Sequence, residues 1–142
     1  MTLGRAGKED EDMWIFCKQG FFSAVAHEDN ADFMHVRARF KGDLERLIEW
    51  AGETPLLKNK LSGKRPTVVH TPDHDYEYRA NFTREDWAEI VKAVARDIDY
   101  TNFKDSVHEG TARDDAYMSV WATMATYADA VKHSEDGAVT VE

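Results

Sequence analysis

Two short apolar runs near the N-terminus, only two residues apart, constrain the fold of this chain more than any other feature. The runs are Trp14–Lys18 and Phe21–Ala26, with Gln19 and Gly20 between them. A two-residue connection that contains glycine is typical of a β-hairpin, because glycine readily adopts the positive φ that tight hairpin turns require. The sequence therefore predicts an antiparallel sheet that begins with this hairpin.

A third strand is predicted over 33–40, where apolar and polar residues alternate. Side chains on a strand point to opposite faces in turn, so one face carries Met34, Val36, Ala38 and Phe40, and the other carries Phe33, His35, Arg37 and Arg39. We expect the first three strands to form an antiparallel meander.

A short helix and two further strands are expected after the meander. Asp43 can cap a helix that runs to Trp50 and ends at Gly52, because its carboxylate can accept hydrogen bonds from the first free N–H groups. The residues 53–66 carry prolines and a basic cluster, which favours an exposed loop. Strands are expected at 67–71 and 76–82.

Two longer amphipathic helices are predicted in the C-terminal half. Thr83 begins a capping box before the first, whose apolar residues at helical spacing are Trp87, Ile90, Val91, Val94 and Ile98. The second is predicted over 112–132, with an inner stripe of Tyr117, Val120, Trp121, Met124, Tyr127 or Ala128, and Val131. The predicted fold class is α+β, a small antiparallel sheet with the C-terminal helices packed on one face.

Charge, length and cysteine content narrow the classes of function. The chain has 142 residues and a formal net charge of −9, which opposes binding to nucleic acid or to an anionic membrane. The single cysteine, Cys17, excludes an internal disulfide and favours a reducing compartment. No secretory signal or membrane span is recognisable, so we expect a cytoplasmic protein. We expect a flexible arm over 1–12, a single domain over 13–132 and a flexible tail over 133–142.

The sequence contains no complete catalytic motif. Cys17 has no histidine or helix N-terminus nearby in sequence to activate its thiol, which favours a packed core residue over a nucleophile. His70, Asp73, His74 and Asp75 are metal-binding residue types, but their spacing matches no metal motif. Glycine-rich phosphate loops are absent. We therefore expect no catalytic residue, no metal ion and no cofactor, and predict that the protein is not an enzyme.

A row of cationic side chains is the first candidate for a ligand site. His35, Arg37 and Arg39 alternate on one face of the third strand, and a guanidinium group matches two phosphate oxygens at once. The alternative is that the arginines pair with carboxylates on a solvated sheet face. We take Arg37 and Arg39 as candidate ligand-binding residues.

The segment 97–104 is the second candidate. It combines hydrogen-bonding groups with the aromatic residues Tyr100 and Phe103, although an ordinary helix C-terminus is the alternative. Arg113 lies four residues before Tyr117, at the edge of the predicted aromatic stripe, where it can close a core or grip a ligand. Tyr100, Phe103 and Arg113 complete the candidate ligand-binding set.

Several stretches of the chain resemble a group of short phage and bacterial proteins of uncharacterised function. The shared residues are Met13-Trp14-Ile15-Phe16, Gly20-Phe21-Phe22-Ser23, Val36-Arg37-Ala38-Arg39, Asp43-Leu44, Asp75-Tyr76, Tyr78-Arg79, Asp99-Tyr100-Thr101-Asn102-Phe103-Lys104, Tyr117, Val120 and Trp121. The resemblance runs from about Met13 to Tyr127. It implies that the domain starts at Met13.

The predicted architecture is also similar to the first family of phage Thoeris anti-defence proteins. These are non-enzymatic sponges that sequester cyclic ADP-ribose signals and assemble as oligomers. The resemblance implies a nucleotide held without turnover by an aromatic platform and arginines, in the host cytoplasm if a phage encodes the protein. The candidate residues match that family by type and not by an aligned motif.

We therefore expect a binding protein for a small anionic nucleotide of the cyclic ADP-ribose type. A homo-oligomer is expected as well, because the predicted strands leave edges and the chain has more aromatic residues than one small core needs. Two alternatives stay open. One is a protein interaction module of phage or bacterial origin without a small ligand, and the other is a hydrolase whose carboxylates or histidines are not evident as a pair.

Overall fold

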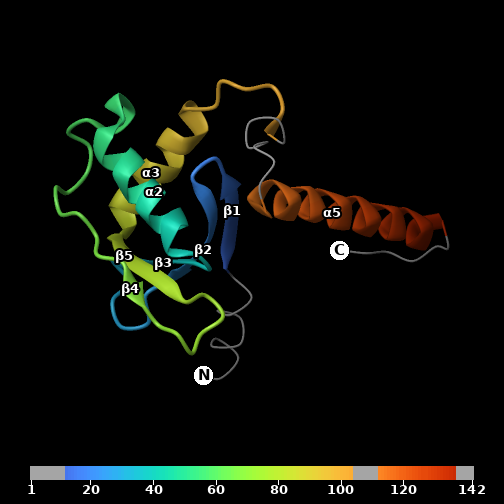
Figure 1. Ribbon diagram of the computed structural model, residues 1–142, viewed down its shortest axis with the longest axis horizontal. Helices are drawn as coiled ribbons and strands as arrows, with labels where there is room; N and C mark the ends of the chain where they lie inside the picture. Colours follow the sequence, from blue (N-terminus) through green and yellow to red (C-terminus); the bar gives the residue numbers. More distant parts are fainter. Residues whose placement is uncertain (1–11, 104–111, 137–142) are drawn as a thin grey trace. The chain divides into compact units, whose positions relative to one another are not determined.

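The computed structural model describes residues 12–103 and 112–136 (Figure 1). The chain divides into two compact units, Met1–Asp99 and Tyr100–Glu142, and each is described by itself. The boundary falls inside the stretch 13–132 that was expected to be one domain. The first eleven residues of the arm expected over 1–12 and the last six residues of the expected tail, 137–142, lie outside the described residues.

The first unit is built on one five-stranded antiparallel sheet (Figure 1). Its strands are β1 (Met13–Cys17), β2 (Gly20–Ala26), β3 (Phe33–Ala38), β4 (Val69–His70) and β5 (Tyr78–Thr83), in the spatial order β1-β2-β3-β5-β4. The predicted hairpin and meander are confirmed. β5 returns to pair with β3, and the two-residue β4 forms the other edge of the sheet.

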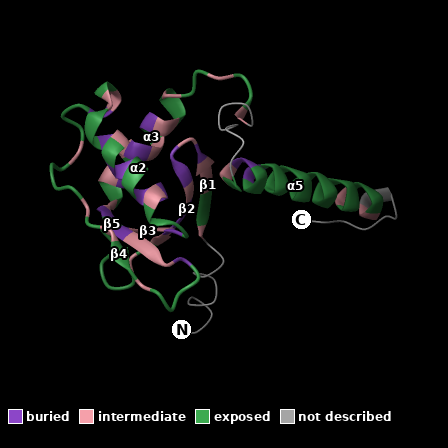
Figure 2. Ribbon diagram, in the orientation of Figure 1, coloured by how far each residue is buried: buried purple, intermediate pink, exposed green. Residues whose placement is uncertain are grey.

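Two helices cover one face of this sheet, α2 (Lys41–Glu53) and α3 (Arg84–Arg96) (Figure 2). On this face lies every second residue of β2, β3 and β5. The buried core residues among them are Phe22, Ala24, Met34, Val36, Ala38, Ala80 and Phe82. Leu44, Leu47 and Ile48 of α2 and Trp87 and Ile90 of α3 pack on them. The α+β fold class with an antiparallel sheet is confirmed. Phe40 was expected on the inner face and is instead 68% exposed, because β3 ends two residues before it.

The start of α2 differs from the prediction in a way that fixes the helix on the sheet. α2 begins at Lys41, and Phe40 at the cap position makes no side-chain capping bond. Asp43 was predicted to cap the helix. Instead its Oδ2 accepts a hydrogen bond of 3.2 Å from the backbone N–H of Phe21, and its other oxygen pairs with Arg46. The capping role of Asp43 was wrong because a tertiary partner on β2 holds the carboxylate.

One of the two hydrogen bonds of the predicted capping box of α3 is confirmed, the bond to the Thr83 side chain. Thr83 Oγ1 accepts a hydrogen bond of 3.0 Å from the Asp86 N–H. The Asp86 carboxylate accepts bonds of 3.0 Å from the Ser62 N–H and 2.7 Å from the Ser62 hydroxyl. Asp86 therefore anchors the long segment between α2 and β4 to α3. Within this segment, which was predicted as a loop, Pro55–Leu57 form a short 3-10 helix, η1.

The second unit consists mainly of α5 (Ala112–Asp136), four residues longer than predicted at its C-terminal end. The stripe predicted to face inward is largely exposed. Tyr117 is buried, but Val120, Trp121, Met124 and Tyr127 are 37%, 56%, 54% and 55% exposed. Within the parts of the chain that the structure describes, no helix is both long and apolar enough to cross a membrane.

Candidate functional site

The second face of the sheet, the one that α2 and α3 leave uncovered, collects the cationic residues of the predicted row. Strand register places Ser23 of β2 opposite Arg37 of β3, and Arg37 opposite Arg79 of β5. His35 of β3 lies opposite Asn81 of β5 on the same face. Two arginines and a histidine from two neighbouring strands therefore lie on one face, and one of them, Arg79, was not among the predicted site residues.

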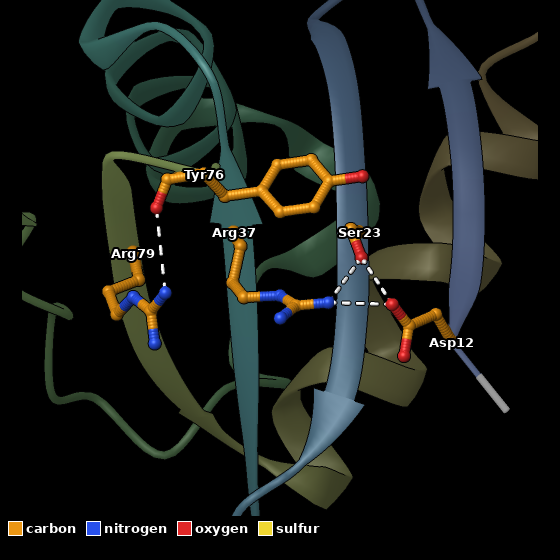
Figure 3. A network of polar contacts seen from close by, with 5 residues as sticks. All are labelled: Asp12, Ser23, Arg37, Tyr76 and Arg79. Atoms are coloured by element: carbon orange, nitrogen blue, oxygen red, sulfur yellow. Dashed lines mark hydrogen bonds and ion pairs between the residues drawn. The ribbon is translucent and has the colours of Figure 1, made fainter. Parts of the chain in front are cut away.

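Arg37 is held by polar partners (Figure 3). Its Nη2 donates to the Asp12 carboxylate and to the Ser23 hydroxyl, both at 2.7 Å. The Arg37 and Asp12 side chains are only 18% and 23% exposed, so the pair is partly shielded from water. This matches the alternative in which an arginine of the row pairs with a carboxylate. Asp12, expected to belong to a flexible arm, takes part in this contact.

Tyr76 joins Arg37 to Arg39. Both guanidinium carbons lie over the Tyr76 ring, at 4.9 Å and 4.6 Å from its centroid, which is cation–π geometry. Arg39 is exposed and donates one hydrogen bond of 3.3 Å, to the backbone oxygen of Asp75. Among the described residues no carboxylate pairs with Arg39. The two predicted arginines therefore share one aromatic partner, but Arg37 has a carboxylate partner and Arg39 has none among the described residues.

An aromatic group adjoins this arginine pair. The Phe21 ring centroid lies 6.2 Å from that of Tyr76, 4.4 Å from that of Phe16, on which it stacks, and 5.7 Å from that of Trp14, to which its ring is nearly perpendicular. Trp14 is 62% exposed. We call Trp14, Phe16, Phe21, Tyr76, Arg37 and Arg39 the aromatic–arginine cluster.

Arg79, His35 and Arg37 each have a buried side-chain nitrogen without a hydrogen-bond partner among the described residues, which for Arg37 is Nε. Arg79 Nη2 donates a long hydrogen bond of 3.5 Å to the Tyr76 carbonyl (Figure 3), while its Nε is buried and has no hydrogen-bond partner among the described residues. His35 Nδ1 is likewise buried without one in that part of the chain. Burial, and after it Arg37, lowers the pKa of Arg79. The pKa of His35 is lowered chiefly by burial, against a hydrogen bond with Asn81 that raises it, and further by His27, Arg79 and Arg37.

A groove of about 530 Å³ runs beside these two residues. Its lining includes Phe33, His35, Lys64, Val69, Arg79 and Asn81. The groove has a size that suits a small ligand, and it offers cationic groups, an amide and an aromatic side chain. Arg79 therefore belongs to the groove on one side and faces Arg37 of the aromatic–arginine cluster on the other.

The remaining predicted residues gather in the second unit. Phe103 stacks on Tyr117 with ring centroids 5.6 Å apart, and Tyr100 lies 6.1 Å from Phe103. The Arg113 guanidinium lies over the Tyr117 ring at 5.3 Å. Tyr100, Phe103 and Arg113 are thus brought together around Tyr117, in a different unit from Arg37 and Arg39.

Sequence reasoning missed Tyr76, Arg79 and the aromatic neighbours on β1 and β2. Tyr76 begins the strand predicted over 76–82, but β5 begins at Tyr78, so the alternation of the predicted strand does not give the face on which Tyr76 lies. Arg79 meets Arg37 only through the register between β3 and β5, which 39 intervening residues separate. The alternation of β2 could have placed Phe21 on the face of Ser23, since residues two apart on a strand share a face.

His70, one of the residues considered for a metal site, contacts a carboxylate and an aromatic ring. His70 Nε2 lies 3.1 Å from Glu77 Oε1, and the His70 ring stacks on Tyr78 at 4.7 Å. In the described ranges, no group of three or more His, Cys, Asp or Glu side chains is arranged to hold an ion. Cys17 is buried, and its Sγ lies 3.6 Å from the Gly20 carbonyl oxygen.

Comparison with known proteins found no matching family model, no matching curated protein and no matching solved structure.

Proposed function

We propose that this protein binds a small anionic nucleotide on the second face of its sheet and holds it without turnover. The observation that supports the proposal is the direct pairing of Arg37 with Arg79 across β3 and β5. Like charges placed directly opposite each other destabilise a sheet. A chain with a net charge of −9 has many carboxylates, yet only Asp12 pairs with this group among the described residues. A bound anion would supply the missing counter-charge.

The three arginines are assigned different parts in this proposal. Arg37 is neutralised by Asp12, so its main part is to hold Tyr76 and the hairpin in place. Arg79 and Arg39 have no carboxylate partner in the described ranges and keep donors for phosphate oxygens. A hydrogen bond to a charged group contributes about 1.5–3 kcal/mol, so loss of either arginine should weaken binding about tenfold or more.

The aromatic residues suggest the rest of the ligand. Trp14 is 62% exposed beside Phe21, and Phe33 lines the groove. Stacking of a base on an aromatic side chain contributes about 1–3 kcal/mol. A nucleotide combines such a base with phosphates, and the resemblance to anti-defence sponges suggests a cyclic ADP-ribose-type signal. The biological effect would then be removal of that signal from the host cytoplasm.

The test is calorimetric titration of the full chain with a panel of cyclic ADP-ribose isomers and cyclic dinucleotides. We expect one ligand to bind the wild type. Arg39→Ala and Arg79→Ala should each weaken it tenfold or more, and the ligand recovered after denaturation of the protein should be chemically unchanged. A converted ligand would instead support the hydrolase that the sequence left open.

A matched control removes the same charge nearby. Lys41→Ala deletes an exposed cation two residues from Arg39, on α2 and outside the second face. This variant should bind like the wild type. If a ligand is found and both arginine variants bind it as tightly as Lys41→Ala does, the site is elsewhere.

The candidates of the second unit belong in the same series. Phe103→Ala and Arg113→Ala test whether the second unit contributes to binding. A loss of affinity comparable to that of Arg39→Ala would add Tyr100, Phe103 and Arg113 to the site as predicted. Unchanged affinity would assign their ring contacts to the packing of the second unit alone.

The interaction module without a small ligand stays the second candidate function. One observation favours it, the exposure of the apolar residues on α5.

A further inference from the structure

α5 carries an exposed apolar row that the proposed ligand site does not use. The row consists of Val120, Trp121, Met124 and Tyr127, which are 37%, 56%, 54% and 55% exposed. From Ala116 to Ala128 the helix contains no charged residue. Large apolar side chains gathered on one exposed helix face, without intervening charge, are typical of a protein-binding surface.

The spacing of the row is that of a helix that packs on another helix. Val120, Met124, Tyr127 and Val131 follow one another at intervals of four, three and four residues. Apolar residues alternating at intervals of three and four follow the seam of a coiled coil. The partner that this seam fits is therefore a helix with the same repeat.

We propose that the partner is α5 of a second copy of this chain, paired in antiparallel orientation through this row. A row of this spacing is self-complementary, because a two-fold axis near its middle brings Met124 against Met124 of the second copy. The same axis places Trp121 of each copy beside Tyr127 of the other. The dimer would then cover the exposed parts of both aromatic side chains.

The charges at the helix ends favour the antiparallel direction. Asp115 is exposed in the first turn, and Lys132 is exposed near the other end of α5. Antiparallel pairing centred on Met124 brings Asp115 close to Lys132 of the second copy, whereas parallel pairing brings Asp115 close to another Asp115. Glu135 and Asp136 follow Lys132 in the sequence, so the apolar row and not the charge supplies most of the attraction.

The size of the row sets the strength of the pairing. An aromatic side chain buries about 150–250 Å² when it is covered completely, so the half-exposed side chains of this row can remove on the order of 400 Å² per copy from water. A stable interface buries about 800 Å² per partner. We therefore expect a dimer that dissociates in the micromolar range.

Sedimentation equilibrium of the full chain over roughly 1–100 μM tests the proposal. The wild type should pass from monomer to dimer, and Met124→Glu should raise the dissociation constant at least about a hundredfold, because it places two like charges on the axis. Ala122→Glu makes the same charge change on the opposite side of the helix and should dimerise like the wild type. Circular dichroism should show the same helix content in all three.

A wild type that stays monomeric over this range, or a Met124→Glu variant that dimerises as well as Ala122→Glu does, would overturn the proposal. A disulfide tests the direction, in a Cys17→Ala background that leaves no other thiol. Met124→Cys should oxidise to a covalent dimer. Val131→Cys should not, because antiparallel pairing centred on Met124 separates the two Val131 positions by about 21 Å along the axis, and a disulfide spans less than about 7 Å between Cα atoms. Cross-linking through Val131 would show parallel pairing.

Discussion

His35 and Arg79 are the residues of the second face for which burial penalises the charged form. Arginine stays charged at any physiological pH, so its desolvation is a fixed cost in the folded state. Histidine can avoid the cost by releasing its proton. Burial of the Arg79 charge therefore destabilises the folded protein at every physiological pH. Burial of His35 instead makes the free energy of unfolding depend on pH.

The sign of this dependence follows from the lowered pKa of His35. The folded pKa lies below the ordinary histidine value of 6.5, so between these two pKa values the unfolded chain binds more protons than the folded protein. The contribution of neutral His35 is fully present above about pH 6.5 and is lost as the pH falls through the folded pKa. We expect the melting temperature to fall between about pH 7 and pH 5, and His35→Asn to flatten this fall.

His74→Asn is the control, since His74 is exposed and lies outside the second face. It should keep the pH profile of the wild type. Equal slopes for the wild type and His35→Asn, measured by thermal denaturation across this pH range, would show that His35 does not titrate differently on folding.

At the scale of elements, the contact between the hairpin and α2 is the tightest junction of the first unit. Gly20 approaches the buried Asp43 so closely that a Cβ at Gly20 would lie 2.5 Å from Asp43 Cγ and 2.7 Å from its Cβ. The Asp43 carboxylate also accepts the bond from Phe21 N–H and pairs with Arg46. These contacts therefore fix the position of the hairpin turn relative to the first turn of α2.

Gly20→Ala should consequently destabilise the protein by about 1–3 kcal/mol, the usual cost of forcing an extra carbon into a packed site. Urea denaturation measures this loss. Gly42→Ala is the control, because its Cβ would meet only the Arg46 Nη1, at 3.4 Å, and alanine is the better helix former. A Gly20→Ala variant as stable as Gly42→Ala would contradict the close approach to Asp43.

The elements themselves were largely predictable, and the site was not. Alternation and the capping residue Thr83 predict the hairpin, the meander and α3, because these signals are local. The partners of Arg37 came from other elements, Asp12 before β1 and Tyr76 before β5. Asp12 lies outside every predicted strand, and Tyr76 lies in a predicted strand that begins two residues later in the structure, so local alternation could not show either contact.

For α5, the sequence predicts the helix but not what its apolar side chains contact. Its apolar spacing predicts a helix correctly, but spacing alone does not say whether the stripe meets the core of the same chain or another molecule. Trp121 and Met124 are more than half exposed, and we propose that a partner helix covers them.

At the scale of the whole molecule, the distribution of charge distinguishes the proposed site from a nucleic-acid groove. The net charge of −9 repels an anionic ligand at long range, while Arg39, Arg79 and Lys64 attract it at short range. Salt screens exposed charges beyond about 8–10 Å more than it screens partly buried contacts. Raising the salt concentration therefore weakens the repulsion along with the attraction.

Binding of the proposed nucleotide should accordingly depend only weakly on salt. Six to ten phosphate contacts to a nucleic acid lose about 10³–10⁵ in affinity between roughly 50 and 200 mM salt, so two contacts should lose no more than about tenfold. The screened repulsion reduces that loss further. Calorimetry at the two salt concentrations measures the ratio, and Arg39→Ala should make it smaller because one attractive contact is gone. A loss of a hundredfold or more would mean that many more cations contact the ligand than the second face presents, and that the ligand is a longer polyanion than a cyclic nucleotide.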